Sequence, residues 1–153
     1  MGLDMYLYAT KYMSKSWGKK KEQEQSKKLR KQFGMSDSGN ANSVTLKFEI
    51  GYWRKANQIH NWFVTNCGEG KDDCNPYRVD REDLKKLLAL IEKVLSIKSV
   101  EIARELLPVK SGFFFGETEY NLDYYEDLQY SKQLIELALG LSDDFEFEYC
   151  ASW

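Results

Sequence analysis

Hydrophobic and polar residues alternate in three short segments of the chain. Leu3–Tyr8 alternates from its first residue, and Val44–Ile50 and Phe145–Tyr149 follow the same pattern. A period of two residues is typical of a strand that buries one face. We therefore expect a strand near each end of the chain and a third strand before its middle.

Three other segments space their apolar residues as a helix does. The first begins near Tyr52 and should end near Cys67, where glycines follow. The second begins at Asp80, a residue type that often caps helices, and the third runs from about Leu122 to Leu139. Together the patterns predict an α+β fold, with a single domain over residues 1–153. We expect a small, mainly antiparallel sheet with about three helices packed on it.

The stretch between the first two predicted strands, residues 11–43, reads as a basic and polar excursion. From Lys11 to Lys31 it has nine basic residues and two acidic ones, although the whole chain has a net charge of −2. We expect a partly helical segment around Glu22–Lys31 and a mobile loop at Ser36–Ser43. Such an excess can mark a nucleic-acid-binding arm, but beyond Trp17 the run offers no aromatic-rich surface for stacking bases. The sequence therefore favours a solvated excursion and disfavours nucleic acid as a partner.

The segment Glu49–Phe63, EIGYWRKANQIHNWF, concentrates the residue types that recognise ligands. On a helix from Tyr52, its only histidine shares a face with apolar residues, and polar side chains border that face as in a pocket wall. Arginine and lysine in the first turn oppose the helix dipole, a cost that a bound phosphate or carboxylate would offset. The aromatic rings suit base stacking, and the structural alternative is an ordinary core. The candidate ligand-binding residues are Tyr52, Trp53, Arg54, Lys55, Asn57, His60, Asn61 and Trp62.

Two aromatic segments precede the third predicted helix. SGFFFG, at Ser111–Gly116, is expected to form a short buried strand or an aromatic hairpin. An acidic, tyrosine-rich segment follows it. Because tyrosine is a common anchor at protein interfaces, the surface around Tyr120–Tyr130 is an alternative site for binding a protein.

The sequence contains no catalytic motif. His60 is the only side chain with an ordinary pKa near neutrality, so any acid–base chemistry would begin there. A nucleophile elbow, a Walker loop and GxGxxG are absent, the carboxylates lack metal-ligand spacing, and the three cysteines form no CxxC pair. We therefore expect no catalytic residue, no metal and no cofactor, and the sequence favours binding over enzymatic activity without deciding between them.

The longest apolar runs are too short to cross a bilayer, and the first residues do not form an export signal. We therefore expect a cytoplasmic protein with no membrane partner.

Several segments resemble a known group of proteins. GLDMYLY at the start, EIGYWRKANQIHNWFV in the middle, and SGFFFG followed by YYEDL are similar to a family of small, largely uncharacterised proteins encoded by bacteriophages and prophages. The resemblance implies a protein made in the cytoplasm of an infected host cell and assigns no catalytic residue. By analogy with other small phage proteins, it also suggests a role in countering host defence.

The resulting hypothesis is a phage-encoded protein that captures an anionic, nucleotide-like ligand in a pocket built on residues 50–64, to counter host defence. Two alternatives stay open: an inhibitor that binds a host protein through Tyr120–Tyr130, and, less favoured, a nucleic-acid binder acting through Lys11–Lys31. A homo-oligomer is also left open.

Overall fold

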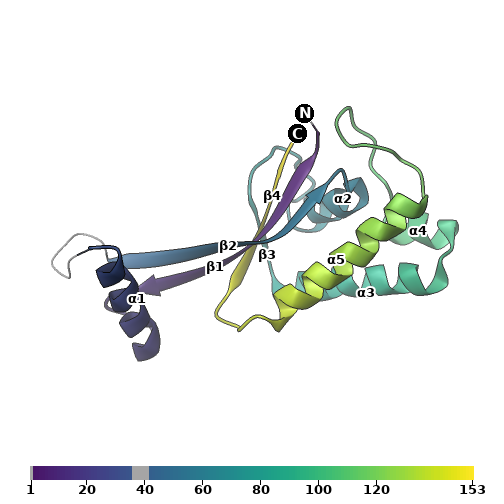
Figure 1. Cartoon of the computed structure of the whole chain (residues 1–153). Coiled ribbons are helices and arrows are strands. Elements are labelled where there is room, and N and C mark those ends of the chain that lie inside the picture. The colour runs from purple at the N-terminus through teal and green to yellow at the C-terminus, as the bar shows by residue number, and fades with distance from the viewer. Residues whose placement is uncertain (1, 36–41) are drawn as a thin grey trace. The chain divides into compact units, whose positions relative to one another are not determined.

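The computed structural model describes residues 2–35 and 42–153. In these residues four strands form one antiparallel sheet in the order β2-β1-β4-β3 (Figure 1). The elements in chain order are β1 (Asp4–Ser14), α1 (Lys20–Gln32), β2 (Ser43–Arg54), α2 (Asn57–Asn66), β3 (Tyr77–Val79), α3 (Arg81–Ile97), α4 (Val100–Leu106), α5 (Leu122–Gly140) and β4 (Glu146–Ser152). The predicted α+β class is confirmed, whereas the described residues contain five helices in place of the expected three.

The chain divides into two compact units. The first unit combines Met1–Ala9 with Glu49–Trp153, and the second unit is Thr10–Phe48. Strands β1 and β2 contribute residues to both. The predicted excursion, residues 11–43, falls inside the second unit. Most of the loop predicted at Ser36–Ser43 lies outside the described residues.

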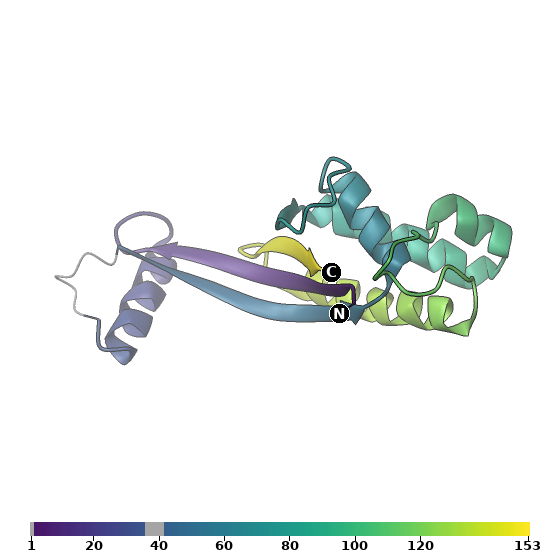
Figure 2. The ribbon, with the colours of Figure 1, turned by 90° about the horizontal axis from the view of Figure 1, so that it is seen from above.

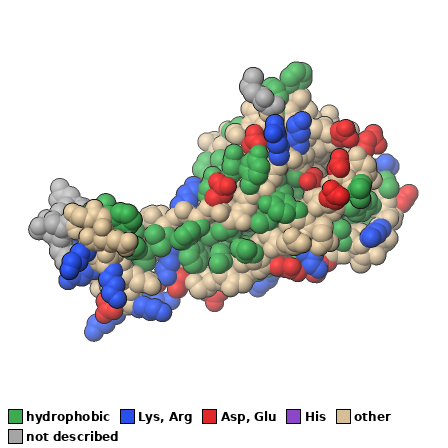
Figure 3. Space-filling model, in the orientation of Figure 1, with side chains coloured by type: hydrophobic (Ala, Val, Ile, Leu, Met, Phe, Trp, Pro, Cys, Tyr) green, Lys and Arg blue, Asp and Glu red, His purple; other side chains and the backbone are tan. Residues whose placement is uncertain are grey.

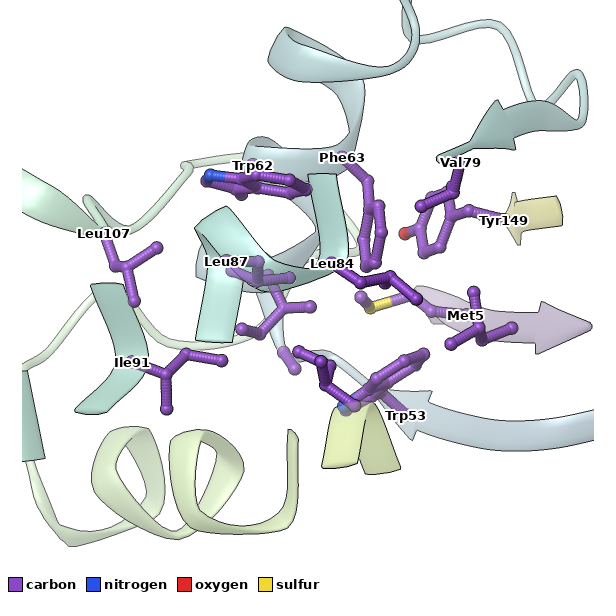
Figure 4. Packing of buried hydrophobic residues seen from close by; sticks show 14 of the residues in the cluster. Met5, Trp53, Trp62, Phe63, Val79, Leu84, Leu87, Ile91, Leu107 and Tyr149 are labelled. Atoms are coloured by element: carbon purple, nitrogen blue, oxygen red, sulfur yellow. The ribbon is translucent and has the colours of Figure 1, made fainter. Parts of the chain in front are cut away.

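The core of the first unit is formed by one face of the sheet and by apolar faces of the helices. Helix α3 packs along α5, and α4 packs against α3 (Figures 1 and 2). Figure 4 shows Phe63 of α2 against Tyr149 of β4, and their ring centroids are 4.2 Å apart at an interplanar angle of 14°. Burial of this apolar surface is the main favourable term for folding. The sheet and α2 are therefore fixed to one another by stacked aromatic rings.

The boundary between β2 and α2 differs from the prediction. The helix expected from Tyr52 begins at Asn57, because β2 continues through Arg54. Gly51 lies inside the strand, where a Cβ atom would come within 2.8 Å of Leu134 Cδ1 of α5. This glycine therefore allows α5 to approach the sheet closely and does not end the strand.

Two other segments also differ from expectation. Ser111–Gly116 forms a turn instead of a strand or hairpin: Phe113 is 95% exposed, while Phe115 is buried against His60 with ring centroids 5.1 Å apart. The short strand β3 was not predicted, since three residues are too few to show alternation. It pairs antiparallel with β4, with Tyr77 opposite Tyr149.

Helices α3 and α5 begin where the sequence predicts them, at residues with suitable caps. Asp80 precedes α3, and its backbone N–H donates to Asp83 Oδ2 at 3.4 Å. Asn121 precedes α5, and its Oδ1 accepts a hydrogen bond from the N–H of Tyr124 at 3.2 Å. These bonds satisfy N–H groups that the first helical turn leaves without partners.

Candidate ligand-binding site

A pocket of about 430 Å³ opens in the first unit between three segments that are distant in sequence. These are the junction of β2 and α2, the loop that leads into α5, and the first turns of α5. Its size is in the range of small-molecule sites. The lining residues are Arg54, Lys55, Asn57, Gln58, Val109, Gly116, Glu117, Glu119, Asn121, Asp123, Tyr124, Glu126 and Asp127.

The pocket has an excess of negative charge. Two cations line it, Arg54 and Lys55, together with five carboxylates: Glu117, Glu119, Asp123, Glu126 and Asp127. Acidic side chains gather near the loop before α5, beside basic ones (Figure 3). Among the residues that the structure describes, neither Arg54 nor Lys55 forms an ion pair. Both groups remain available to a ligand.

Asp127 is the most perturbed carboxyl of the pocket. Burial raises its pKa to about 6; the nearby charges of Asp123 and Glu126 add to the increase, and a hydrogen bond from Gln58 opposes it. The Nε2 of Gln58 donates to Asp127 Oδ2 at 3.2 Å. Asp127 therefore changes its charge just below neutral pH, and a cation beside it would favour the ionised form.

The backbone at the junction of β2 and α2 is unusual at Lys55. This lysine has a φ of 62°, in the left-handed region that costs an L-residue roughly 1–2 kcal/mol. Its N–H donates to Leu3 O at 2.8 Å, and its carbonyl accepts from Asn57 N at 2.7 Å, which closes a tight turn around Ala56. Strained backbone of this kind is concentrated at functional sites in proteins.

The opposite wall touches Lys55 at Gly116, whose φ is 86°. A Cβ atom at Gly116 would lie 3.0 Å from Lys55 Cβ, a tight contact, and the positive φ also favours glycine at this position. This contact joins the junction of β2 and α2 to the loop before α5.

Asn57, a predicted ligand contact, holds the wall of the pocket. Its buried Nδ2 donates to Phe115 O at 3.0 Å and to Glu117 O at 2.8 Å, and its Oδ1 accepts from Lys110 N at 2.9 Å. Both amide protons therefore bind backbone carbonyls of residues 110–117. Asn57 lines the pocket as a residue that positions the loop.

Both predicted tryptophans lie in the core, outside the pocket lining (Figure 4). The Nε1 of Trp53 donates to Ser131 Oγ at 2.8 Å, and Trp62 packs edge-on against Phe63 with centroids 5.4 Å apart. These rings are buried, as the structural alternative for the aromatic residues anticipates.

Tyr52 and Asn61 also lie outside the pocket lining. The hydroxyl of Tyr52 donates to Asp4 Oδ1 at 2.5 Å, and its ring lies 5.3 Å from that of Tyr6. Asn61 is half-buried, with Nδ2 3.5 Å from Pro108 O.

His60 belongs to a separate buried cluster. Its ring is 1% exposed, with Nδ1 2.7 Å from Tyr149 OH and Nε2 3.1 Å from Asp72 Oδ1. The carboxylate can only accept, so Nε2 carries the proton and Nδ1 accepts from the tyrosine hydroxyl. Burial lowers the pKa of His60, and Asp72 partly offsets the decrease. Trp153 Nε1 also donates to Asp72 Oδ1, at 3.1 Å.

Of the predicted ligand-binding residues, Arg54, Lys55 and Asn57 line the pocket. Gln58 and the five carboxylates also line it and were not among the predicted residues. The acidic residues were visible in the sequence as a cluster around YYED. No local spacing related them to the β2–α2 junction, because Glu117 and Glu119 lie on a loop that Asn57 positions and the other three carboxylates lie on α5.

Comparison of the chain with protein-family models, curated proteins and solved structures finds no match. In residues 2–35 and 42–153, no helix is long and apolar enough to cross a membrane. Within the same residues, no three or more His, Cys, Asp or Glu side chains are grouped so as to hold a metal ion.

Proposed function

We propose that this chain is a small-molecule-binding protein whose pocket accepts a zwitterionic ligand. A cationic amino or guanidinium group would bind the carboxylates, and an anionic group would bind Arg54 and Lys55. The observation that carries the proposal is a pocket of about 430 Å³ that presents five carboxylates and two cations without ion pairs between the signs. An amino acid with a basic side chain has this charge pattern.

The sequence hypothesis of an anionic, nucleotide-like ligand stays a prediction. Three excess negative charges would repel a ligand that carries only negative charge, since charges in a partly buried site are weakly screened. An exocyclic amine on a base could use the carboxylates, but a phosphate chain would have only two cations. The phage origin and the role against host defence also stay predictions of the resemblance.

The alternative of a protein-binding surface has less support. Of the tyrosines in Tyr120–Tyr130, Tyr124 is buried and its hydroxyl donates to Leu107 O at 2.9 Å. Tyr130 is exposed, but a single exposed ring is a small anchor for an interface. A protein partner could still place one basic side chain in the pocket, so the test includes a peptide that contains arginine.

The test is isothermal titration of the full chain at pH 7.5 and low salt with four probes. These are L-arginine, agmatine, AMP and the blocked peptide acetyl-Gly-Arg-Gly-amide. Agmatine keeps the guanidinium of L-arginine and lacks its carboxylate, whereas AMP supplies only the anionic nucleotide. We expect L-arginine to bind more tightly than agmatine, and AMP not to bind.

Variants locate the binding. Arg54→Gln should weaken the binding of L-arginine and leave the binding of agmatine unchanged, because only L-arginine has a carboxylate for Arg54. Asp127→Asn should weaken the binding of both ligands. Tightest binding of AMP would support the nucleotide prediction instead, and tightest binding of the peptide would indicate a protein partner. Absence of binding by all four probes would refute the proposal.

A further inference from the structure

The second unit, Thr10–Phe48, has a charge opposite to that of the pocket in the first unit. It contains ten basic and three acidic residues, in a chain whose total charge is −2. Basic side chains gather over α1 (Figure 3). Positive charges that lie close together repel one another, and a bound anion reduces this repulsion. A unit of this kind therefore attracts anions.

The basic side chains surround a hollow in the described part of this unit. The cavity measures about 510 Å³ and is lined by Lys15, Lys20, Gln23, Glu24, Lys27 and Arg30. Positions 20, 23, 24 and 27 share one face of α1, since their spacing matches the helical repeat. Arg30 is buried, and its Nε donates to Ser26 O at 3.4 Å. Four cations and one carboxylate therefore face the same space.

Aromatic rings are exposed in the same unit. Tyr12 is 51% exposed and Trp17 is 64% exposed, with ring centroids 5.5 Å apart at an interplanar angle of 35°. From the sequence only Trp17 was expected to offer a ring, because the contact between Trp17 and Tyr12 near the end of β1 has no signal in the sequence. Large rings exposed to water do not contribute the free energy that burial would give. Their flat faces are suited to stacking on bases.

The combination favours one class of partner. A helix that inserts into a membrane surface needs an apolar face, but α1 has the sequence KKEQEQSKKLRKQ, with Leu29 as its only apolar residue. Lysines and exposed aromatic rings in one unit match the phosphates and unpaired bases of a single strand. We propose that the segment Tyr12–Arg30 binds single-stranded nucleic acid, with the lysines around α1 on phosphates and with Tyr12 and Trp17 stacking on bases.

The test measures fluorescence anisotropy of labelled dT15 and rU15 with the full chain at 50 and 200 mM NaCl. For four phosphate contacts on a single strand, affinity should fall by about 50-fold between these salt concentrations. A 15-base-pair duplex of mixed sequence should bind more weakly than either single strand, because its bases are not open to stacking.

Paired variants separate charge from stacking. Trp17→Leu should lower affinity by about 5- to 150-fold, whereas Trp17→Phe should stay near the parent because it keeps a stacking ring. Lys20→Gln should reduce the slope of log affinity against log salt by about 0.7. The matched controls lie in the first unit: Phe113→Leu removes an exposed ring and Lys93→Gln an exposed charge, and neither should change binding.

Four results would overturn the proposal, and the first three concern nucleic acid. These are no binding of dT15 or rU15 at 50 mM salt, tighter binding of the duplex than of the single strands, or equal affinity of Trp17→Leu and the parent. Binding to vesicles of phosphatidylcholine and phosphatidylglycerol without binding to dT15 or rU15 would also overturn it, in favour of a membrane surface. Arg54→Gln should leave the binding of nucleic acid unchanged, so this proposal and the pocket proposal can fail independently.

Discussion

The segment Glu49–Phe63 supplies polar side chains to two regions of the first unit that differ in how those side chains are satisfied. At the pocket, Arg54 and Lys55 are exposed and form no ion pair within the described residues. In the second region His60 is buried, and both of its ring nitrogens have hydrogen-bond partners. A histidine, an arginine and a lysine close in sequence look like one site, yet only the region with unused groups can bind a ligand without first breaking internal bonds.

The comparison predicts that His60 and Asn57 matter for stability and that Arg54 and Lys55 matter for binding. The following substitutions test it, beginning with the largest expected change in the free energy of unfolding.

Asn57→Ala should lower the free energy of unfolding by about 3–5 kcal/mol, because it removes three hydrogen bonds and leaves Phe115 O, Glu117 O and Lys110 N without that partner. Urea denaturation followed by circular dichroism measures the loss. Asn61→Ala is the control, since its amide has only a 3.5 Å contact, and it should cost under about 0.5 kcal/mol. A loss below about 1 kcal/mol for Asn57→Ala would mean that the loop before α5 does not depend on this side chain.

Tyr149→Phe should lower the free energy of unfolding by about 1–3 kcal/mol, because the stacked ring stays while Nδ1 of His60 loses its buried donor. The same variant should bind L-arginine as the parent does, since His60 and Tyr149 do not line the pocket. Tyr130→Phe removes an exposed hydroxyl and serves as the control. A change in the affinity for L-arginine with unchanged stability would reverse the roles given to the two regions.

The two regions should also respond to acid in opposite directions. The pKa of Asp127 is raised to about 6, so its contribution to stability is fully present below its ordinary pKa near 3.8 and is lost as the pH rises through 6. The pKa of His60 is lowered, so its contribution is present above about 6.5 and is lost as the pH falls through the folded-state value.

Asp127→Asn should therefore raise the free energy of unfolding above pH 6, by about 1–2 kcal/mol after allowance for solvent screening. In this variant the free energy of unfolding should also fall more steeply than in the parent between pH 6.5 and 4, because the contribution of His60 is then no longer opposed by that of Asp127. Urea denaturation across this range, with Glu105→Gln as an exposed control, gives the slopes. A variant with the pH profile of the parent would show that Asp127 is ionised normally.

The sequence predicted the elements whose signal is local. Leu3–Tyr8 and the apolar stripe of α3 repeat at the periods of a strand and a helix, and Asp80 stands before the helix that follows it. The start of α2 could not be found in this way. Gly51 looks like the end of the strand, but it lies inside β2 and close to Leu134 of α5, more than eighty residues later.

The candidate site was predicted only in part for the same reason. The sequence hypothesis assigned Arg54 and His60, six residues apart on one predicted helix, to a single ligand. Because β2 continues to Arg54 and the chain turns at Lys55, these side chains serve different regions. The carboxylates around Asp127 reach the pocket through contacts made by Asn57 and Gln58, and such contacts have no periodic signature in the sequence.

Lys55 gives the smallest expected change in stability and the sharpest test of the comparison. In Lys55→Gly, relief of the left-handed backbone, worth roughly 1–2 kcal/mol, is offset by the greater entropy of an unfolded glycine, about 0.5–1 kcal/mol, and by lost contact with Gly116. The free energy of unfolding should therefore stay within about 1 kcal/mol of the parent, while affinity for L-arginine falls at least fivefold through loss of a charged contact.

Lys55→Met separates the charge of Lys55 from its packing, because methionine keeps an unbranched stem over Gly116 and the same backbone strain. Equal loss of affinity in the methionine and glycine variants would assign the effect to the ammonium group. If Lys55→Gly instead lost more than about 2 kcal/mol of stability with unchanged affinity, the stem would be a structural element like Asn57. The left-handed conformation would then be explained by packing, and Arg54 alone would remain as the cation of the pocket.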